Sequence, residues 1–593
     1  MSAQTTPYLD HPSLRLVKPD IKNAARMIEF AFANDSLLGY EGETIAAALA
    51  ANGRLALGWG PGGAGRGIFC GMGVCQECLV TVNGIPSQRA CATELTQGIQ
   101  IFPQGYRIDP SKLVLSPNQS TPPLFHEPEI LVIGGGPAGM SAARAAALCR
   151  AKVILVDERS NLGGQYFKQL AKPFRFVKPT AGDRQFRAGR ALIEETRRVG
   201  VDIWSDSVVW GAFAPLEIAV AVGAQQHVLR PQCLIIATGA YERGVPYPGW
   251  TLPGSMTTGA AQTLQRAYRV APGRRVLIAG NGPLNFQLAA DLIADGVNVV
   301  ALVEAAQSPA FASFFSLLRA IRASPELIFD GMRYVRRIRR ADVPILYGSA
   351  VVSAGGDGQV KKAVVARIKS SGEPEAGSEQ TFEADAICSG YGFLPVNDIA
   401  RALGCRHRFD SATGALVVER DDDCLTSRPR VYVVGDSGAA NGARAALAQG
   451  SIAGIQAVRS LGYLINPKAE RELARARRRL SVAYTFQTAL WELFKAPTLT
   501  HQLASAETII CRCEGVTREA IDRAMRNETV SVASVKRQTR AGMGRCQGKY
   551  CSHIIAALVK MKPGVDLDEF TFLAPRPPIK PLSINTLAQN AEQ

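Results

Sequence analysis

Hydrophobic positions along the chain alternate between strand-like runs and helix-like stretches, which is the pattern of an α/β protein. Residues 128–158 have the order strand, glycine-rich turn, helix, strand, and residues 275–304 repeat that order. The similar order and length of the two segments predict two dinucleotide-binding folds in one chain. Residues 429–454 have the pattern of a return to the first of these folds.

The flanking segments have patterns of their own. The N-terminal region begins with a strand, a turn, a second strand and then a helix that starts near Thr44. We expect the following division: an N-terminal unit (24–108), a polar, proline-rich linker (109–127), the first part of the first dinucleotide fold (128–245), the second dinucleotide fold (246–388), the second part of the first fold (389–465), a helical linker (466–506), a small cysteine-bearing unit (507–562) and a loosely ordered, proline-rich tail (563–593).

Length and composition indicate a soluble protein of several domains. A chain of 593 residues is too long for one core. It has no signal-peptide pattern at its start and no apolar run of about 18 residues, so we expect no membrane span and a cytoplasmic location. Thiols stay reduced there, and clustered cysteines then indicate metal ligands or redox groups.

The net charge of +16 has two open explanations: a generally basic surface with no special partner, or a surface that binds an acidic partner protein. The basic runs 336–340 and 475–479 have no interleaved aromatic residues and match no nucleic-acid motif, so we expect no nucleic-acid partner.

The N-terminal unit carries a cysteine set typical of plant-type [2Fe–2S] ferredoxins. The spacing is C-x4-C-x2-C, with a fourth cysteine after twelve intervening residues: Cys70, Cys75, Cys78 and Cys91. The fourth cysteine of plant ferredoxins lies further along, and the short gap resembles that of the ferredoxin modules of molybdenum hydroxylases and cyanide-synthase-type enzymes. Four thiolates must converge on a small cluster, and Gly71 and Gly73 permit the tight turns that this needs. A structural zinc site is the alternative, although this spacing is unusual for zinc.

The first dinucleotide fold carries the motifs of a flavoprotein. The turn after its first strand has the form G-x-G-x-x-G, with Gly134, Gly136, Pro137, Ala138 and Gly139. An acid for the ribose is expected about 20 residues later. Candidate positions for this acid and for the later FAD motifs are Asp157, Glu158, Gly164, Gln165, Ala237, Thr238, Gly239, Gly435 and Asp436. These motifs predict FAD, with another ADP-containing nucleotide as the alternative.

The second dinucleotide fold departs from the pattern. After Gly280 and Gly282 it has Asn285 where a third glycine or an alanine is usual, and we expect the larger side chain to push the helix away from the strand. Glu304 ends the second strand and could bind a ribose. We expect a retained fold without NAD. The residues directly after Gly164 (QYFKQL) and after Gly282 (PLNFQL) include no cysteine, so the redox pair of disulfide reductases is missing. The sequence indicates no catalytic residue.

A second cysteine set lies near the C-terminus. A C-x-C pair is followed by a C-x4-C pair: Cys511, Cys513, Cys546 and Cys551. A helix capped by Thr517 separates the pairs, and Cys551 stands where another helix begins. The set resembles the bacterioferritin-associated-ferredoxin type of [2Fe–2S] module, which usually has C-x2-C as its second pair. A zinc site or an empty site is the alternative.

The order of these units resembles a known kind of subunit. Residues 241–262, 390–405 and 541–551 are similar to stretches of the α-type subunits of cyanide-synthase-like and opine-oxidase-like enzymes. The α subunits of heterotetrameric sarcosine oxidase and of proline or hydroxyproline dehydrogenase are similar more loosely. The fold class implied is α/β: a glutathione-reductase-like flavoprotein with two dinucleotide-binding domains, an N-terminal β-grasp ferredoxin domain and a small C-terminal bacterioferritin-associated-ferredoxin-like domain.

The resemblance implies a function in electron transfer. Substrate oxidation at a CH–NH bond would take place on a partner β subunit with a D-amino-acid-oxidase-like fold and its own FAD. This chain would accept the electrons through FAD, two [2Fe–2S] clusters and an FMN between the subunits, and pass them to an external acceptor. Two alternatives remain: a self-sufficient NAD(P)H-dependent reductase, and a non-enzymatic iron-delivery or redox-sensing protein.

Overall fold

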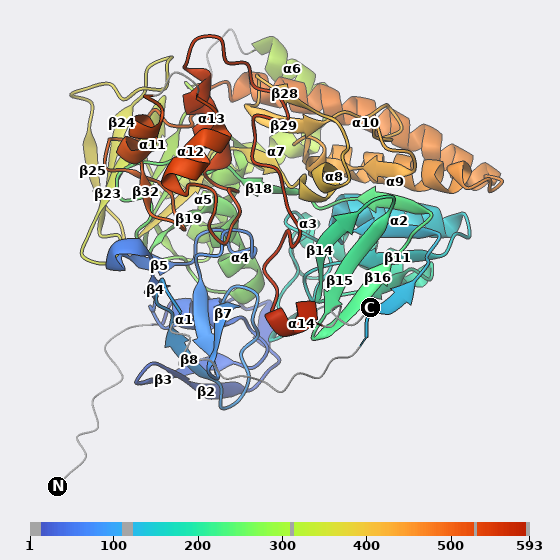
Figure 1. Ribbon diagram of the computed structural model, residues 1–593. Coiled ribbons are helices and arrows are strands. Elements are labelled where there is room, and N and C mark those ends of the chain that lie inside the picture. The colour runs from blue at the N-terminus through green and yellow to red at the C-terminus, as the bar shows by residue number, and fades with distance from the viewer. Residues whose placement is uncertain (1–12, 109–121, 179, 309–313, 527–529, 589–593) are drawn as a thin grey trace.

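The computed structural model describes residues 13–108, 122–178, 180–308, 314–526 and 530–588. In Figure 1 the second dinucleotide fold (green) lies between the N-terminal unit (blue) and the C-terminal unit (red), and the first dinucleotide fold (cyan) lies on the right. Most of the predicted linker, residues 109–121, lies outside the described residues. Within them, no helix is both long and apolar enough to cross a membrane.

The N-terminal unit has the predicted β-grasp architecture. Its sheet has the order β3-β2-β8-β6-β7, and a short helix covers it. The predicted helix near Thr44 is confirmed, since the Thr44 hydroxyl accepts a hydrogen bond from the N–H of Ala47 at 3.3 Å and caps α1. The elements are β2 (Met27–Phe32), β3 (Asp35–Tyr40), α1 (Ile45–Ala51), β6 (Leu79–Val82), β7 (Ile85–Arg89) and β8 (Gln100–Pro103), with the small pair β4 (Ala56–Trp59) and β5 (Gly65–Gly67) beside them.

The first dinucleotide fold is a parallel sheet built from both parts of the chain that we expected. The strand order is β13-β11-β10-β17-β30, and β30 returns from far along the sequence to pair with β17. The elements are β10 (Ile130–Ile133), α2 (Pro137–Leu148), β11 (Val153–Val156), α3 (Arg184–Arg198), β13 (Asp202–Trp204), β17 (Cys233–Ile236), β30 (Val431–Val433) and α9 (Gly442–Ser460). A mixed sheet adjoins it, in which β14 (Ser207–Phe213), β15 (Glu217–Val222) and β16 (Gln225–Leu229) are antiparallel and β9 (Leu124–His126) pairs parallel with β16.

The second dinucleotide fold has its own parallel sheet in the order β19-β26-β20-β21-β22. Its elements are β19 (Ser255–Thr257), α4 (Thr258–Tyr268), β20 (Arg275–Gly280), α5 (Pro283–Ala294), β21 (Asn298–Glu304), β22 (Ile345–Tyr347) and β26 (Ala386–Gly390). Strands β18 (Ala240–Glu242) and β27 (Phe393–Pro395) pair where the chain passes between the two folds.

The expectation that Asn285 separates helix from strand is wrong. Asn285 is buried, and its Nδ2 donates to the carbonyl of Gly390 at 3.0 Å while its Oδ1 accepts from the hydroxyl of Thr258 at 2.8 Å. The side chain fits because Gly280 and Gly390 present no Cβ to it: a Cβ on either would lie 2.5 or 2.6 Å from the Asn285 amide. Asn285 therefore joins α5 to the sheet by hydrogen bonds.

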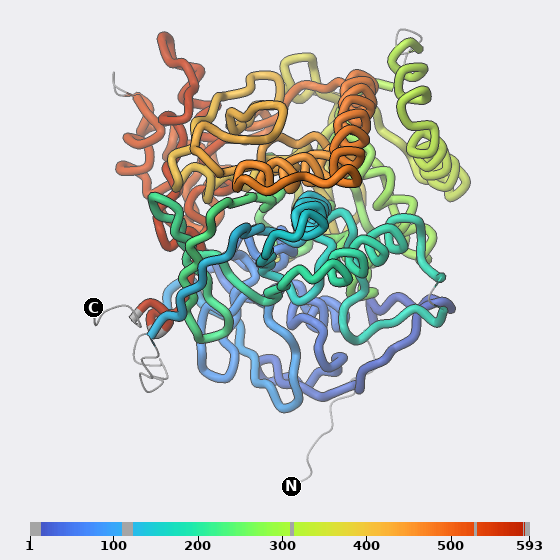
Figure 2. Tube along the Cα trace, turned by 90° about the vertical axis from the view of Figure 1, so that its right-hand side faces the viewer, coloured from blue at the N-terminus to red at the C-terminus, as the bar shows by residue number. Residues whose placement is uncertain are grey.

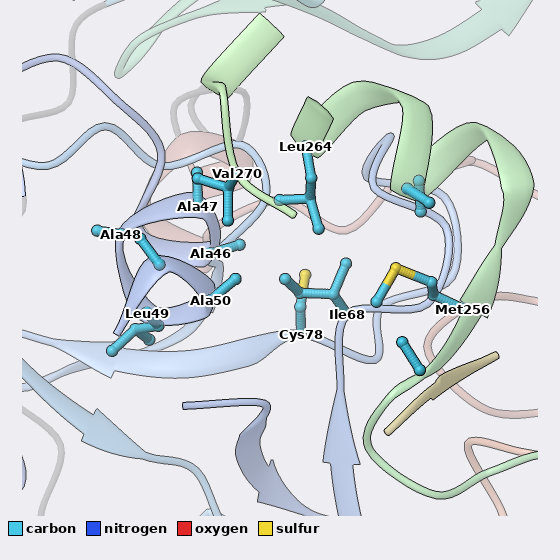
Figure 3. Packing of buried hydrophobic residues seen from close by; sticks show 14 of the residues in the cluster. Ala46, Ala47, Ala48, Leu49, Ala50, Ile68, Cys78, Met256, Leu264 and Val270 are labelled. Carbon is cyan, nitrogen blue, oxygen red and sulfur yellow. The ribbon is translucent and has the colours of Figure 1, made fainter. Parts of the chain in front are cut away.

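The N-terminal unit shares a hydrophobic core with the second dinucleotide fold. Figure 3 shows Ala50 of α1 together with Ile68 and Cys78, facing Leu264 and Met256 from the other unit. These side chains are all nearly inaccessible to solvent. The shared core fixes the loop of the first cysteine set against α4.

The C-terminal region contains the predicted helical linker and cysteine-bearing unit. Helix α10 (Pro467–Leu493) packs against α9. The small unit consists of β31 (Ile509–Cys511), β32 (Val516–Thr517), α11 (Arg518–Ala524), α12 (Val532–Thr539) and α13 (Ser552–Lys560). The Thr517 hydroxyl caps α11, and Cys551 is the N-cap residue of α13, as predicted.

The expectation of a loosely ordered tail is wrong for the residues that the structure describes. The chain continues from the C-terminal unit to the first dinucleotide fold and ends beside it in α14 (Ile584–Ala588) (Figures 1 and 2). On the way the carbonyl of Leu573 accepts from Arg401 at 2.8 Å, and the N–H of Ile579 donates to the carbonyl of Trp210 at 2.7 Å. These hydrogen bonds join the tail to both parts of the first dinucleotide fold.

Candidate flavin and iron–sulfur sites

A cavity of about 2890 Å³ opens between the first dinucleotide fold, the second fold, the N-terminal unit and the tail. Most of the predicted cofactor-binding residues line it: Gly134, Gly136, Pro137, Ala138, Asp157, Glu158, Gly164, Gln165, Ala237, Thr238, Gly239 and Asp436. Gly139 and Gly435 do not line the cavity. Both are packed behind the residues that line it. Cys70, Cys91 and Cys546 also border the cavity, so both cysteine sets reach it.

The glycine turn after β10 has the shape of a dinucleotide cradle. Gly134 has a φ of 108°, which residues with a side chain rarely adopt. A Cβ on Gly139 would lie 1.8 Å from the carbonyl oxygen of Gly134. A Cβ on Gly136 would meet only the Cα of Gly164, at 3.9 Å, so this backbone faces open space. No side chain caps the N-terminus of α2, which leaves its N–H groups for a pyrophosphate. These residues fit the ADP half of FAD.

Two carboxylates of the first fold lie at the cavity and hold its loops. Asp157 accepts from the N–H of Gly135 at 2.5 Å and from the N–H of Arg159 at 2.8 Å. Asp436 accepts from the N–H groups of Asn441 and Gly442 at 3.0 and 3.1 Å. Burial raises the pKa of both carboxyl groups despite these bonds.

Glu158 joins three parts of the chain. It forms ion pairs with Arg89 of the N-terminal unit, at 2.6 Å, and with Lys580 of the tail. Burial would raise the pKa of Glu158, but the charges of Lys580 and Arg89 outweigh it and lower the pKa to about 2. No pattern in the sequence indicates either basic partner, because each lies far from Glu158 in the chain.

The glycine turn of the second fold borders the same cavity. Glu304 has no accessible surface, and its carboxylate accepts from the side chain of Asn281 at 2.8 Å, from the N–H of Gly282 at 3.0 Å and from the N–H of Ala306 at 2.9 Å. The indole of Trp491 packs over Gly282, 3.5 Å from where a Cβ would stand. A ribose bound at this turn would have to displace or share these contacts.

The first cysteine set converges in two pairs. Cys70 lies within hydrogen-bonding reach of Cys75, and Cys91 within reach of Cys78. The Sγ of Cys70 also accepts from the N–H groups of Met72 and Cys75 at 3.5 and 3.4 Å. Burial would raise the pKa of the Cys70 thiol, but these hydrogen bonds lower it to about 6. Two thiolates for each of two irons is the ligand set of a [2Fe–2S] cluster.

Gly71 and Gly73 shape the loop that holds the first set. Their φ angles are +59° and +77°, in the left-handed region that favours glycine. The turns that the sequence predicted at these positions are confirmed.

The second cysteine set also converges. The Sγ of Cys513 lies 3.8 Å from that of Cys511 and 3.7 Å from that of Cys546, and Cys551 lies within hydrogen-bonding reach of Cys511. Four thiols that converge in this way could hold either a [2Fe–2S] cluster or a zinc ion.

Comparisons with known proteins agree with this arrangement. Residues 128–450 match the family described as pyridine nucleotide-disulphide oxidoreductase. The chain belongs to this family. Residues 25–105 match the 2Fe-2S iron-sulfur cluster binding domain, and residues 509–561 match the BFD-like [2Fe-2S] binding domain. The predicted fold class is confirmed, including the units at both ends.

Several relatives of this oxidoreductase chain are subunits of larger enzymes. The HcnB subunit of hydrogen cyanide synthase from Pseudomonas aeruginosa is 32% identical over 76% of this chain and 96% of that protein. One of the opine oxidase subunits of Rhizobium meliloti is 29% identical over 78% of this chain and 87% of its own length. The alpha subunit of sarcosine oxidase from Corynebacterium sp. (strain P-1) is 25% identical over 92% of this chain and 54% of that protein. The family resemblance seen in the sequence is confirmed.

A solved structure has the same fold. The L-proline dehydrogenase from P. horikoshii covers 96% of this chain and 98% of its own, with a TM-score of 0.69 at 20% identity. The likeness extends over nearly the whole oxidoreductase chain, so its units are arranged as in a known protein.

The cavity of this oxidoreductase also holds two buried titratable groups that the sequence did not indicate. The Nζ of Lys168 donates to the Oε1 of Gln262 at 2.8 Å, and the Oε2 of Glu242 accepts from the N–H of Gly259 at 2.8 Å. Burial lowers the pKa of Lys168 and raises the pKa of Glu242, each to about 7. Neither belongs to a motif, and only the fold brings them to the same cavity.

We expect the purified chain to contain about four irons and four acid-labile sulfides per molecule, because each cysteine set fits one [2Fe–2S] cluster. Cys75→Ser and Cys513→Ser should each remove one cluster and about half of the iron. Metal and sulfide analysis gives the result, with the buried core residue Cys388→Ser as the control. A content of two irons and one zinc per molecule would contradict an iron–sulfur cluster at the C-terminal set.

We expect Asp157→Ala to weaken flavin binding by about 1.5–3 kcal/mol, since a buried charged hydrogen-bonding group at the glycine turn is lost. The flavin content after dialysis and the dissociation constant measure this. Asp202→Ala, an exposed acid on the neighbouring strand β13, is the matched control. Equal flavin affinity in the parent and in Asp157→Ala would show that Asp157 has no part in the site.

Proposed function

We propose that the chain is the electron-accepting subunit of a heteromeric flavin-dependent dehydrogenase or oxidase. The enzyme would act on the CH–NH bonds of opines or related secondary amines and amino acids, on a β subunit with a D-amino-acid-oxidase-like fold and its own FAD. The names of the relatives support this proposal, because they are subunits of opine oxidase, sarcosine oxidase and cyanide synthase.

The observation that carries the proposal is that one cavity borders all three predicted cofactor sites. Gly136 of the flavin cradle, Cys70 of the first cysteine set and Cys546 of the second line this cavity together. A flavin accepts two electrons as a hydride, whereas an iron–sulfur cluster carries one, so this set of groups would split electron pairs and export single electrons.

The chain's own residues would shield the flavin and the clusters from water and hold them close to one another. The N-terminus of α2 would bind the FAD pyrophosphate, and the buried cysteine loops would hold the clusters. An FMN would lie at the interface with the partner subunit. The five cysteines outside the two sets are buried and form no disulfide.

We propose that the partner subunit binds a surface beside the cavity. Helices α6 (Phe314–Ala323) and α7 (Pro325–Arg340) expose large apolar side chains, with Phe315 77%, Phe329 65% and Met332 52% exposed. Exposed apolar surface of this kind marks interaction sites. Met332 also lines the cavity, so a partner bound here would bring its flavin to the cavity. The basic residues of α7, Arg336, Arg337, Arg339 and Arg340 among them, favour a partner with an acidic rim.

We expect the isolated chain to oxidise no amine, amino acid or opine, and its flavin to remain oxidised when NADH is added. The reason for the second expectation is that the Glu304 carboxylate is already hydrogen-bonded and the Trp491 indole packs over Gly282. Substrate should reduce the chain only when the β-type subunit is present, which anaerobic absorption spectra would record. Rapid reduction of the flavin by NADH would favour the self-sufficient reductase instead.

We expect the double change Phe315→Asp and Phe329→Asp to abolish co-purification with the co-expressed β-type subunit, because charges would enter the apolar contact. Flavin and iron content should stay at the level of the parent. Phe570→Asp, at a side chain 84% exposed on the tail, is the matched control and should leave the complex intact. A complex of unchanged affinity would exclude this surface.

A further inference from the structure

The two cysteine-bearing units meet at a buried ion pair. Glu77 directly precedes Cys78 of the first set, and Arg512 lies between Cys511 and Cys513 of the second set. The Nε and Nη2 of Arg512 both lie 3.1 Å from the same Glu77 oxygen, and the side chains are only 4% and 3% exposed. One charge of the pair is thus attached to each cysteine loop.

A second cation makes this junction positive. The Nε of Arg66 lies 3.5 Å from the same oxygen of Glu77, and its side chain is 5% exposed. The Nε and Nη2 of Arg66 have no hydrogen-bond partner in the described part of the chain. Two guanidinium groups therefore face one carboxylate, and a buried excess charge is strongly unfavourable without a counter-charge. The thiolate sets on either side supply that counter-charge, so the junction fits two anionic metal centres.

Aromatic side chains fix the guanidinium of Arg512 in place. Its carbon lies 3.9 Å from the ring centre of Phe69 and 4.6 Å from that of Trp250, and its Nη1 donates to the carbonyl of Trp250 at 2.7 Å. The ring of Tyr550 packs edge-on against Phe69, with 5.1 Å between their centres. Stacking and hydrogen bonds together hold the guanidinium of Arg512 in this position.

The same rings connect the cysteine loops. Phe69 directly precedes Cys70, and Tyr550 directly precedes Cys551. Both rings are buried, and the Phe69–Tyr550 contact is therefore a direct contact between the neighbours of one ligand from each set.

We propose that Arg512 and Glu77 set the direction of electron transfer between the two cysteine sites, a proposal that rests on the proposed electron-transfer function. The positive charge of Arg512, which is attached to the C-terminal cysteine loop, favours an added electron at the C-terminal site, whereas on the N-terminal side the negative charge of Glu77 offsets the charge of Arg66. In the step, the N-terminal centre loses one electron and is oxidised, and the C-terminal centre gains that electron and is reduced. No bond forms or breaks, and no proton moves.

The test is a redox titration of the holo-chain with dithionite and mediators, followed by electron paramagnetic resonance. Cys75→Ser and Cys513→Ser assign each signal to its site. Arg512→Gln should lower the midpoint potential of the C-terminal site more than that of the N-terminal site, so that the reduced fraction of the C-terminal site relative to the N-terminal site falls at least tenfold, or about 59 mV for a one-electron couple. Glu77→Gln should instead raise the midpoint potential of the N-terminal site.

Two further variants separate charge from structure. Arg512→Lys keeps the charge but loses the planar stacking, so it should keep a potential close to that of the parent. Arg269→Gln removes a buried arginine whose ion pair is with Asp295, outside this junction, and should change neither potential. Iron content is measured for every variant. If Arg512→Gln has no cluster at the C-terminal site, the shift of the midpoint potential in Glu77→Gln is the test of the proposal.

The outcomes distinguish this inference from the proposed function. Unchanged potentials in Arg512→Gln and Glu77→Gln, or equal shifts in Arg512→Lys and Arg512→Gln, would overturn the role of the ion pair even if the partner subunit reduces the chain. Shifts as expected, with no reduction by any partner, would support the ion pair and overturn the proposed function. A parent chain with one cluster only would overturn the inference outright.

Discussion

The contact between Arg512 and Glu77 is the interaction on which the arrangement of the redox sites depends. It joins the loops of the two cysteine sets across units that lie far apart in the sequence, and it is buried among Phe69, Trp250 and Tyr550. A buried ion pair is stable only with good geometry and further hydrogen bonds. Arg512 has both, through its two contacts to Glu77 and its bond to the carbonyl of Trp250.

The flavin cradle is attached to the same junction. Tyr241 follows the Ala237–Gly239 segment in β18, its ring lies 5.4 Å from that of Tyr550, and its hydroxyl donates to the carbonyl of Lys549 at 2.9 Å. The strand that borders the predicted flavin site therefore continues into the aromatic contact between the cysteine loops. The ion pairs of Glu158 with Arg89 and Lys580 brace the other side of the cavity.

Local patterns allowed much of this structure to be predicted. Glycine turns, strand runs and the caps at Thr44 and Thr517 depend on neighbouring residues, and the structure has them where the sequence indicated. The cysteine sets were visible because ligand spacing is local. The Glu158 ion pairs, the Lys168–Gln262 contact and the ordered tail were not predictable, because their partners come from distant segments. The prediction that Asn285 separates helix from strand was wrong because the fit of its side chain depends on two glycines, one of them more than a hundred residues away.

Electron transfer between the two cysteine sites requires two [2Fe–2S] centres that lie side by side at the Arg512–Glu77 junction. The most direct measurement is the paramagnetic resonance spectrum of the fully reduced chain, compared with those of Cys75→Ser and Cys513→Ser. Adjacent centres predict a spin–spin interaction, seen as splitting or faster relaxation, that neither single-site variant shows. A parent spectrum equal to the simple sum of the two single-site spectra would contradict the placement of two centres at this junction.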